Sequence, residues 1–344
     1  MKWFLKRCLL ILLLVFSIAF PAWADISLED EEKAGKSSDK LVKEHFGVYE
    51  DEKLQEYIER IGQKLLESIE DPMFKFHFTV VDDPMLNAFA LPGGYIYITR
   101  GMLAYLDSEA ALAGVLGHEI GHVIGHHAFK AMKKSLKDML VVLAGVGAGI
   151  ASGQSASDVA AWVTAGVQVS QMASAGYGRE MEMQSDEFGL IYAYDAGYDP
   201  GEHAKFFRML QFKRRMSGSE YHGFMASHPE TIERIIRARE KADVLKNRGG
   251  KVEIKRDEYL TMIEGLTYGK GNKRAKLPPP YVIALYTSSK GDDFRKIARD
   301  VAGDEAMAFE IAVMNAMREK DEIPPGYLLK IPVKRKLQPE NAPQ

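Results

Sequence analysis

Cysteine is nearly absent from the sequence. The 344 residues include one cysteine, Cys8, so no disulfide bond can form within the chain. Long basic runs are also missing, and the formal net charge is −3. An acidic chain without a long lysine- or arginine-rich stretch is not typical of nucleic-acid binding, so we expect no nucleic-acid partner.

Long apolar runs are confined to the start of the chain. Residues 9–20 are almost wholly apolar, follow three basic residues and precede the tripeptide Ala22-Trp23-Ala24. This pattern is typical of a secretory signal peptide, whereas a membrane span needs about 20 apolar residues. We predict that residues 1–24 are removed on export, which also removes Cys8. The mature chain would be periplasmic, without a transmembrane span, and any metal site would consist of histidine and carboxylate.

The rest of the chain predicts a large, mainly helical domain and a small second module. Helical patterns dominate residues 25–267, interrupted by a strand in "FKFHFTVV" and a hairpin around "LPGG". The fold class is therefore α+β, with a small sheet that borders a cleft. We predict a Gly/Pro/basic linker at 268–280, a βααβ module at 281–334 and a tail at 335–344.

An Ala/Gly-rich segment at residues 139–175 allows two interpretations. Its apolar first half is about fourteen residues, which is short of a membrane span. We predict two small-residue helices that pack closely together. The alternative is a mobile lid that touches a membrane.

Four of the nine histidines lie in "GHEIGHVIGHH", residues 117–127. On a helix, His118 and His122 face the same way one turn apart and can chelate one ion. Glu119 lies beside them, where it can reach a water on the metal. This H-E-x-x-H arrangement is a zinc-hydrolase signature. If the helix continues, His126 borders the metal face and His127 points away from it.

The third metal ligand has to come from another part of the chain, because the position that a longer histidine motif would use is Ala128. Glu182 is the best candidate, because Asp186 lies four residues later and can accept a hydrogen bond from a ligating histidine. Glu180 competes but lies on nearly the opposite face. Two histidines and one glutamate leave a position open, as in catalytic zinc sites.

Four segments carry a family resemblance: "NAFALPGGYIYITRGML", "LAGVLGHEIGHVIGHH", "GYGREMEMQSDEFG" and "SHPETIERI". In this order they resemble the HtpX-like and CAAX-prenyl-protease-like zinc metallopeptidases, most closely the soluble periplasmic BepA-like branch. The resemblance implies one Zn²⁺ held by His118, His122 and Glu182. It also implies Glu119 as the catalytic base and Asp186 as a supporting residue. Many relatives have arginine where this chain has His126.

Further site residues are predicted around this centre. His228, in "SHPET", is expected either to stabilise the oxyanion or to occupy the open zinc position, and the plain alternative is a histidine at a helix start. Tyr177 could also brace the oxyanion. Arg179 and Arg234 are expected beside the ligands. The predicted substrate-binding residues belong to the two strands of the hairpin: Asn87, Ala88, Phe89, Ala90 and Tyr95.

The predicted activity is zinc-dependent hydrolysis of peptide bonds. Glu119 would take a proton from the zinc-bound water and return it to the leaving amine. An edge strand of the hairpin would hold an extended peptide through its backbone, so we expect unfolded polypeptides as substrates. The resemblance also implies that the substrates are envelope proteins and that the protein serves in protein quality control.

The C-terminal module resembles a degenerate LysM domain, through "KGDDFRKIARDV", Asn315 and "PPGYLLKIPV". Such modules bind peptidoglycan, and the alternative is a small packing domain. The alternative for the whole protein is a non-enzymatic chaperone, tethered to peptidoglycan, whose zinc is structural.

Overall fold

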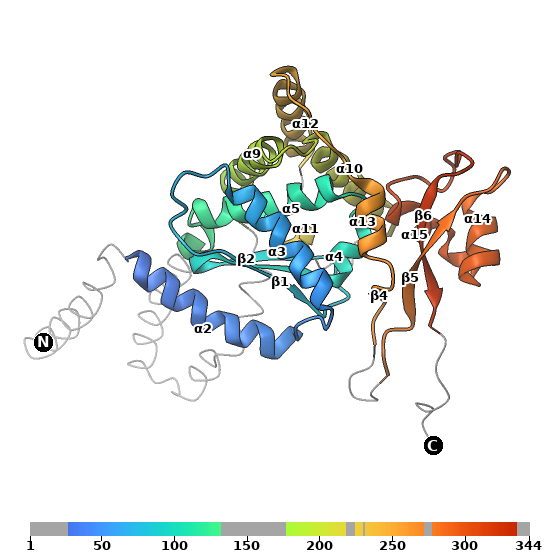
Figure 1. Cartoon of the computed structure of the whole chain (residues 1–344), viewed down its shortest axis with the longest axis horizontal. Coiled ribbons are helices and arrows are strands. Elements are labelled where there is room, and N and C mark those ends of the chain that lie inside the picture. Colours follow the sequence, from blue (N-terminus) through green and yellow to red (C-terminus); the bar gives the residue numbers. More distant parts are fainter. Residues whose placement is uncertain (1–26, 132–176, 218–223, 230, 272–276, 336–344) are drawn as a thin grey trace, which may run out of the picture.

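A computed structural model describes most of the chain, and the predicted signal peptide and the segment 139–175 lie outside the described residues. Within these, two three-stranded sheets accompany a larger number of helices, which confirms the α+β class (Figure 1). None of the helices in the described ranges combines the length and the apolar character that crossing a membrane requires. The described residues are 27–131, 177–217, 224–229, 231–271 and 277–335.

The first sheet contains the predicted hairpin. Strand β3 (Tyr95–Thr99) lies in the centre, parallel to β1 (His77–Val81) and antiparallel to β2 (Ala88–Leu91). The turn between β2 and β3 is the short helix η2 (Pro92–Gly94), where positive φ angles at both glycines favour residues without a Cβ atom. Because β3 lies between β1 and β2, β2 is an edge strand and β3 is not.

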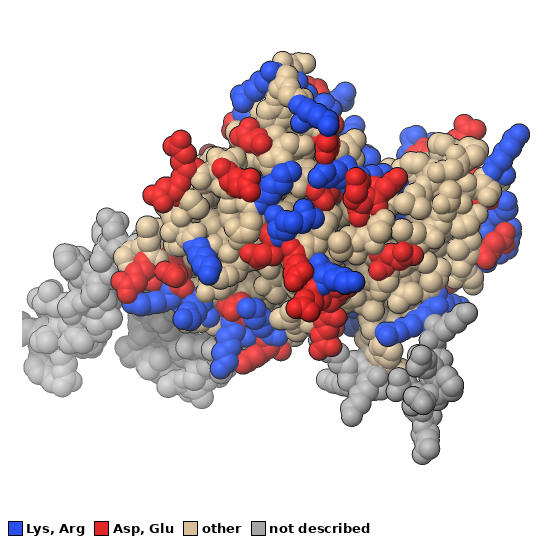
Figure 2. Space-filling view, viewed as in Figure 1, with Lys and Arg blue, Asp and Glu red and all other residues tan. Residues whose placement is uncertain are grey.

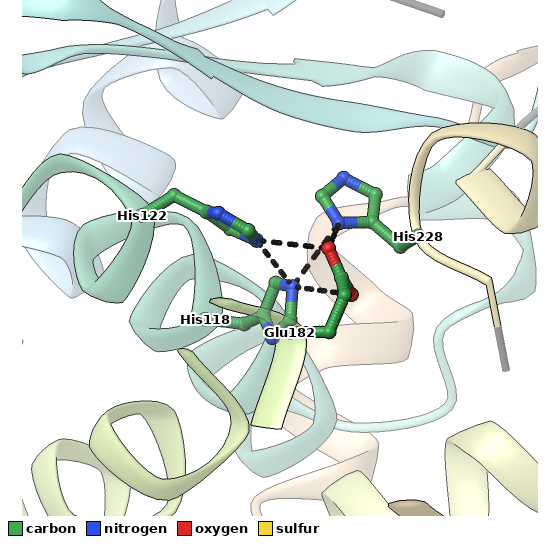
Figure 3. Close-up of side chains that lie close together, drawn as sticks. All are labelled: His118, His122, Glu182 and His228. Carbon is green, nitrogen blue, oxygen red and sulfur yellow. Dashed lines mark hydrogen bonds and ion pairs between the residues drawn. The ribbon is translucent and has the colours of Figure 1, made fainter. Parts of the chain in front are cut away.

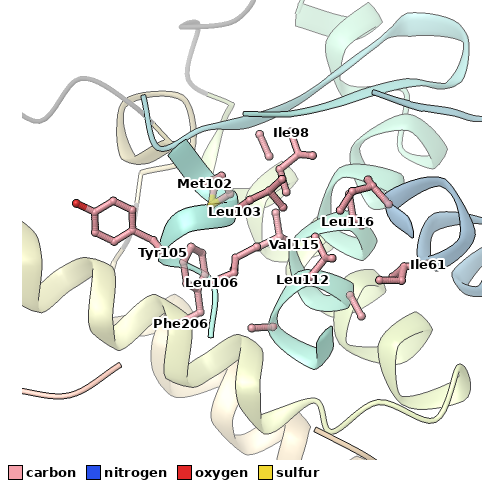
Figure 4. Packing of buried hydrophobic residues seen from close by; sticks show 14 of the residues in the cluster. Ile61, Ile98, Met102, Leu103, Tyr105, Leu106, Leu112, Val115, Leu116 and Phe206 are labelled. Atoms are coloured by element: carbon pink, nitrogen blue, oxygen red, sulfur yellow. The ribbon is translucent and has the colours of Figure 1, made fainter. Parts of the chain in front are cut away.

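Helices cover both faces of this sheet. Helix α2 (Leu28–Phe46) packs on one face, and α3 (Glu52–Leu66) and α5 (Glu109–Ile124) pack on the other (Figure 1). Successive side chains of each strand point to opposite faces of the sheet, and Phe89 and Tyr97 point to the α2 side, where they lie in a cluster with Val42. Ala88 and Ala90 belong to the main core, part of which Figure 4 shows around α5.

The remaining helices surround α5. Helix α9 (Arg179–Asp195) makes the most extensive contact with it, at a close approach of small residues. A Cβ atom on Gly189 would lie 2.7 Å from the His118 backbone nitrogen, and one on Gly121 would lie 3.0 Å from Cα of Ser185. These glycines bring the helix that carries Glu182 against the helix that carries the histidine motif. The helices are α4 (Arg100–Tyr105), α9 (Arg179–Asp195), α10 (Gly201–Ser217), α11 (Phe224–Ser227), α12 (Ile232–Asn247) and α13 (Arg256–Met262).

The C-terminal module has the predicted βααβ order, and its sheet also takes a strand from the preceding segment. Strand β4 (Thr267–Tyr268) pairs with β5 (Tyr281–Thr287), which pairs with β6 (Leu328–Lys334). Because β4 lies at the predicted boundary at residue 267, the sheet crosses that boundary. The other elements of the module are α14 (Phe294–Ile297), η3 (Ala298–Ala302), η4 (Glu305–Met307) and α15 (Ala308–Met314).

Buried polar contacts join the module to the helical domain. Arg256 donates to Asp107 and to the Leu328 carbonyl, and Lys213 pairs with Glu310 at 2.8 Å. The fully buried Lys330 side chain donates to the Leu106 carbonyl. On the face shown in Figure 2, acidic and basic side chains of the described residues are interspersed.

Candidate metal centre

Helix α5 places the histidine motif at the centre of the molecule. Ser108 caps the helix by accepting a hydrogen bond from the Ala111 backbone N–H, and the helix ends at Ile124. His118, Glu119 and His122 are completely buried. The Nε2 atoms of His118 and His122 lie 3.0 Å apart, so both imidazoles point into the same small space.

Two further side chains complete this space (Figure 3). Oε1 of Glu182 lies 3.4 Å from Nε2 of His122, and Nδ1 of His228 lies 3.0 Å from Oε1 of Glu182. The same His228 nitrogen is 3.2 Å from Nε2 of His118. His228 directly follows helix α11 and donates its backbone N–H to the Phe224 carbonyl, while the backbone N–H of Phe224 donates to the Leu86 carbonyl.

The protonation states suit a cation. Burial lowers the pKa of His118 to about 4 and holds the pKa of His122 well below its usual value, so both are neutral at pH 7. Burial alone would raise the pKa of Glu182. The charge on His228 and hydrogen bonds from His122 and His228 outweigh it and hold that pKa well below its usual value. Two neutral imidazoles and a carboxylate are the ligand forms that a metal requires.

The donor set fits zinc. The four donor atoms, from His118, His122, Glu182 and His228, lie within 4.8 Å of one another. A tetrahedral zinc site with nitrogen and oxygen ligands separates its donors by roughly 3.3 Å, close to the 3.0–3.4 Å found for most pairs here. Nitrogen and oxygen donors without sulfur match the chemistry that the sequence allows.

Comparison with known proteins decides the family. The model of peptidase family M48 matches residues 52–242, which include all four donors. The chain belongs to peptidase family M48. It therefore contains a zinc metallopeptidase domain, and zinc is the cofactor of this centre.

Named relatives agree with the family. The β-barrel assembly-enhancing protease of Escherichia coli is 24% identical over 294 residues, 80% of this chain and 60% of that protein. The human mitochondrial metalloendopeptidase OMA1 is 31% identical over 159 residues, 45% of this chain and 30% of that protein. In Yersinia pestis, a β-barrel assembly-enhancing protease is 31% identical over 103 residues, 30% of this chain and 21% of that protein. This M48 chain thus spans less than two thirds of the length of these relatives.

A carboxylate and a guanidinium support the ligands from behind. Oδ1 of Asp186 lies 2.9 Å from Nδ1 of His118, which leaves Nε2 of that ring for the metal. Arg234 donates two hydrogen bonds of 2.7 Å to Asp186 and also lies 2.7 Å from Oε2 of Glu182. It donates a further hydrogen bond to the Pro229 carbonyl, next to His228. Arg234 therefore ties the two carboxylates to the loop of His228.

Glu119 stands next to the donors without joining them. Its carboxylate oxygens are buried and have no hydrogen-bond partner among the described residues, and Oε1 lies 3.6 Å from Nε2 of His228. Burial raises the pKa of Glu119 to about 7, the value at which a carboxylate can both take up and release a proton. Tyr177 stacks on His122, with ring centroids 4.0 Å apart.

The end of the motif differs from the helical expectation. Helix α5 does not continue to His127, because the chain turns at Gly125 and His126 adopts a positive φ of 54°. His126 therefore points away from the donors and pairs with Glu31 of α2 at 2.7 Å. His127 returns toward the centre, where its Nδ1 lies 3.0 Å from Nδ1 of His122.

Three other expectations need correction. Arg179 is the first residue of α9, and its side chain is 64% exposed and pairs with Glu233, away from the donors. Tyr95 packs against the cluster that contains Val42 of α2, on the face of the sheet opposite α5, so it does not border the metal face. Phe89 packs in the cluster beneath α2 rather than toward α5.

The other predicted substrate residues lie closer to the centre. Ala88 and Ala90 belong to the edge strand and to the core on the side of α5, and the Ala90 backbone amide is near enough to Glu119 to lower its pKa against the effect of burial. Asn87 is buried directly before the strand. His203 is fully buried beside His118 and Asp186, and no motif in the sequence marks its position.

Proposed function

We propose that the protein is a zinc metalloendopeptidase in which His118, His122 and Glu182 hold the ion and Glu119 is the general base. The observation that carries this proposal is a fully buried Glu119 carboxylate, without a side-chain hydrogen bond among the described residues, beside the neutral imidazoles of His118 and His122 and the ionised Glu182. A purely structural zinc site has no use for such a group, because burying a carboxylate with so few partners costs free energy.

The residues divide the work of hydrolysis. Zinc in this centre supplies a Lewis acid that polarises a peptide carbonyl and makes water more acidic. Glu119 takes the proton of the attacking water and delivers it to the leaving amine. A pKa of about 7 suits both steps. Asp186 and Arg234 keep His118 and Glu182 in place throughout.

The experiment that tests this function is Glu119→Gln. The variant should bind zinc like the parent and lose cleavage of unfolded casein by a factor on the order of 10² to 10⁴, because the base is gone while the ligands remain. Cleavage at the parent rate would refute the proposal and favour the alternative, a non-enzymatic chaperone with a structural zinc.

We further propose that the observed arrangement is a resting state closed by His228. Its imidazole lies between the other donors and Glu119, with Nδ1 in the donor cluster and Nε2 3.6 Å from Oε1 of Glu119. Once the His228 imidazole has released its proton, four protein donors leave no open position, whereas catalytic zinc sites keep one. His228 therefore has to move before a substrate carbonyl can reach the centre.

The proposed substrates are unfolded segments of envelope proteins. An extended peptide would pair with the edge strand β2 through backbone hydrogen bonds. Because such pairing depends little on side chains but requires an extended chain, it favours polypeptides that lack tertiary structure. The relative in Escherichia coli, named for enhancing β-barrel assembly, supports a role in envelope protein quality control. A periplasmic location, reached through the predicted signal peptide, belongs to the same proposal. Equal digestion of folded and unfolded forms of one protein would contradict it.

For the C-terminal module, we propose that residues 281–334 bind peptidoglycan. Support comes from a hollow of about 970 Å³ lined by the loops at Asp292 and Glu322 and by two aromatic rings, Phe309 of the module and Phe212 of α10. The test is sedimentation of the full chain with purified cell-wall sacculi, since the module shares its sheet with β4. Binding is supported if the parent protein sediments with the sacculi and the double variant Lys320→Ala, Glu322→Ala sediments less. A parent protein that stays in the supernatant refutes the proposal.

A further inference from the structure

His127 lies directly behind the zinc ligand His122, in a position comparable to that of Asp186 behind His118. Its Nδ1 is 3.0 Å from Nδ1 of His122, and its Nε2 is 3.0 Å from Oε1 of Gln184. Ser185 adds a contact of 3.2 Å between its hydroxyl and Nδ1 of His127. His127 is 1% exposed, so these hydrogen bonds are shielded from solvent.

The direction of these hydrogen bonds follows from one requirement. His122 faces the other donors with Nε2, so that nitrogen must carry a lone pair and Nδ1 must carry the proton. Nδ1 of His127 then accepts from His122, which leaves the proton of His127 on Nε2. Oε1 of Gln184 accepts a hydrogen bond from this N–H. The chain His122, His127 and Gln184 thus has a single consistent polarity.

The local backbone is shaped to bring His127 to this position. Gly125 ends the helix where any Cβ atom would lie 2.4 Å from Nε2 of His127. His126 adopts a left-handed φ of 54°, a conformation that is unfavourable for a residue with a side chain. The ion pair of His126 with Glu31 holds this turn from outside. A conformation that is unfavourable in itself and held in place by its neighbours is a common feature of functional sites.

We propose that His127, with Gln184 as its acceptor, is a positioning residue that fixes the tautomer and ring orientation of His122 for zinc. This inference rests on the zinc centre of the proposed function. It assigns a role to the motif's last histidine beyond packing, and to Gln184 a role that the sequence does not indicate. Partners behind metal ligands commonly contribute 10- to 100-fold to metal affinity.

The test measures the zinc dissociation constant by competition with a chelator, together with the visible spectrum of the cobalt-substituted protein. His127→Phe keeps a ring and removes both nitrogens, so it should weaken zinc roughly 10- to 100-fold and alter the cobalt spectrum. His127→Asn offers an oxygen where Nδ1 was and should recover most of the affinity. Glu180→Gln, on the exposed face of α9, is the control and should behave like the parent.

Gln184→Met provides a test if substitutions at the buried His127 prevent folding, because Gln184 is exposed. It should weaken zinc binding severalfold, whereas Gln184→Glu, which retains an acceptor, should not. Parent-like affinity and spectrum in both His127→Phe and Gln184→Met would overturn the inference, as would failure of His127→Asn to recover affinity. A parent protein that binds no zinc would instead refute the proposed function.

Discussion

Arg234 of α12 and Asp186 of α9 form a fully buried pair joined by two hydrogen bonds of 2.7 Å. Oδ1 of Asp186 in turn lies 2.9 Å from Nδ1 of His118, so the pair directly contacts a metal ligand. Burial would raise the pKa of Asp186, and the hydrogen bonds from Arg234 hold it well below its usual value instead. His118 and His203 also lower this pKa, and Arg234 supplies the positive charge with which the buried carboxylate pairs.

Removal of this guanidinium should destabilise the protein strongly. Arg234→Gln leaves a buried carboxylate without its counter-charge, and breaking such a pair typically costs 3–5 kcal/mol. Arg237→Gln is the matched control, because Arg237 lies on the same helix in an exposed pair with Glu233 and should change stability by less than about 1 kcal/mol. Urea unfolding curves measure both variants. Equal midpoints would show that the Arg234 pair does not stabilise this part of the fold.

His228→Ala should increase cleavage of unfolded casein at saturating zinc. A closed state that holds nine tenths of the molecules would hide nine tenths of the sites, so the increase could reach roughly tenfold. Zinc affinity should fall, since one of the four donors is lost. A variant with slower cleavage at full zinc occupancy would contradict the closed resting state. It would support oxyanion stabilisation, which the sequence left as an alternative.

Gly35→Ala should destabilise the docking of α2 on the hairpin. The added Cβ atom would lie 1.9 Å from the Pro92 carbonyl oxygen, which is backbone and cannot move aside easily. We expect a loss of about 1–3 kcal/mol, as for other overpacked sites. The control is Ser37→Ala on the exposed side of the same helix, which should have little effect. If thermal unfolding does not separate the two variants, α2 does not pack on the hairpin as described.

The buried Lys330 should make stability depend on pH. Burial lowers its pKa to about 7, while an unfolded lysine keeps its ordinary value near 10.5. Between these values the unfolded chain binds more protons, so stability should rise with pH by up to roughly 1.4 kcal/mol per pH unit. The charged groups that act on this lysine are Asp107, Arg256 and Lys205.

Lys330→Met isolates this effect. The variant lacks the titrating group, so the stability difference between parent and variant should shift in favour of the parent between about pH 7 and about pH 9.5. Unfolding by urea at both pH values measures the shift. A difference that stays constant over this range would mean that the lysine titrates normally in the folded protein.

The sequence predicts much of the fold because local signals specify it. Helix α5 has a serine cap, the hairpin has two glycines at its turn, and both match the structure. The motif spacing also predicts that His118 and His122 point together. Glu182 is far from both histidines in the sequence, so spacing alone does not identify it as the third ligand. Its assignment rests on the family resemblance and on Asp186, which lies four residues later on the same helix.

Other features arise from long-range packing that the sequence alone does not specify. The turn at His126 depends on Glu31, which lies 95 residues earlier in the chain. The exposure of Arg179 depends on where α12 lies relative to α9. Likewise, β4 joins the sheet of the module although the composition changes near residue 268, because backbone pairing with β5 decides its place.

The central claim is that His118, His122 and Glu182 together hold zinc while Glu119 does not. Metal content of the purified mature protein tests it most directly, by elemental analysis of the parent, Glu182→Ala and Glu119→Gln. We predict one zinc per chain in the parent and in Glu119→Gln, and a large loss in Glu182→Ala. That substitution removes the anionic donor of the cluster and leaves the Arg234 guanidinium, 2.7 Å from Oε2 of Glu182 in the parent, facing the remaining imidazoles. Full zinc occupancy in Glu182→Ala, or none in the parent, would contradict the account.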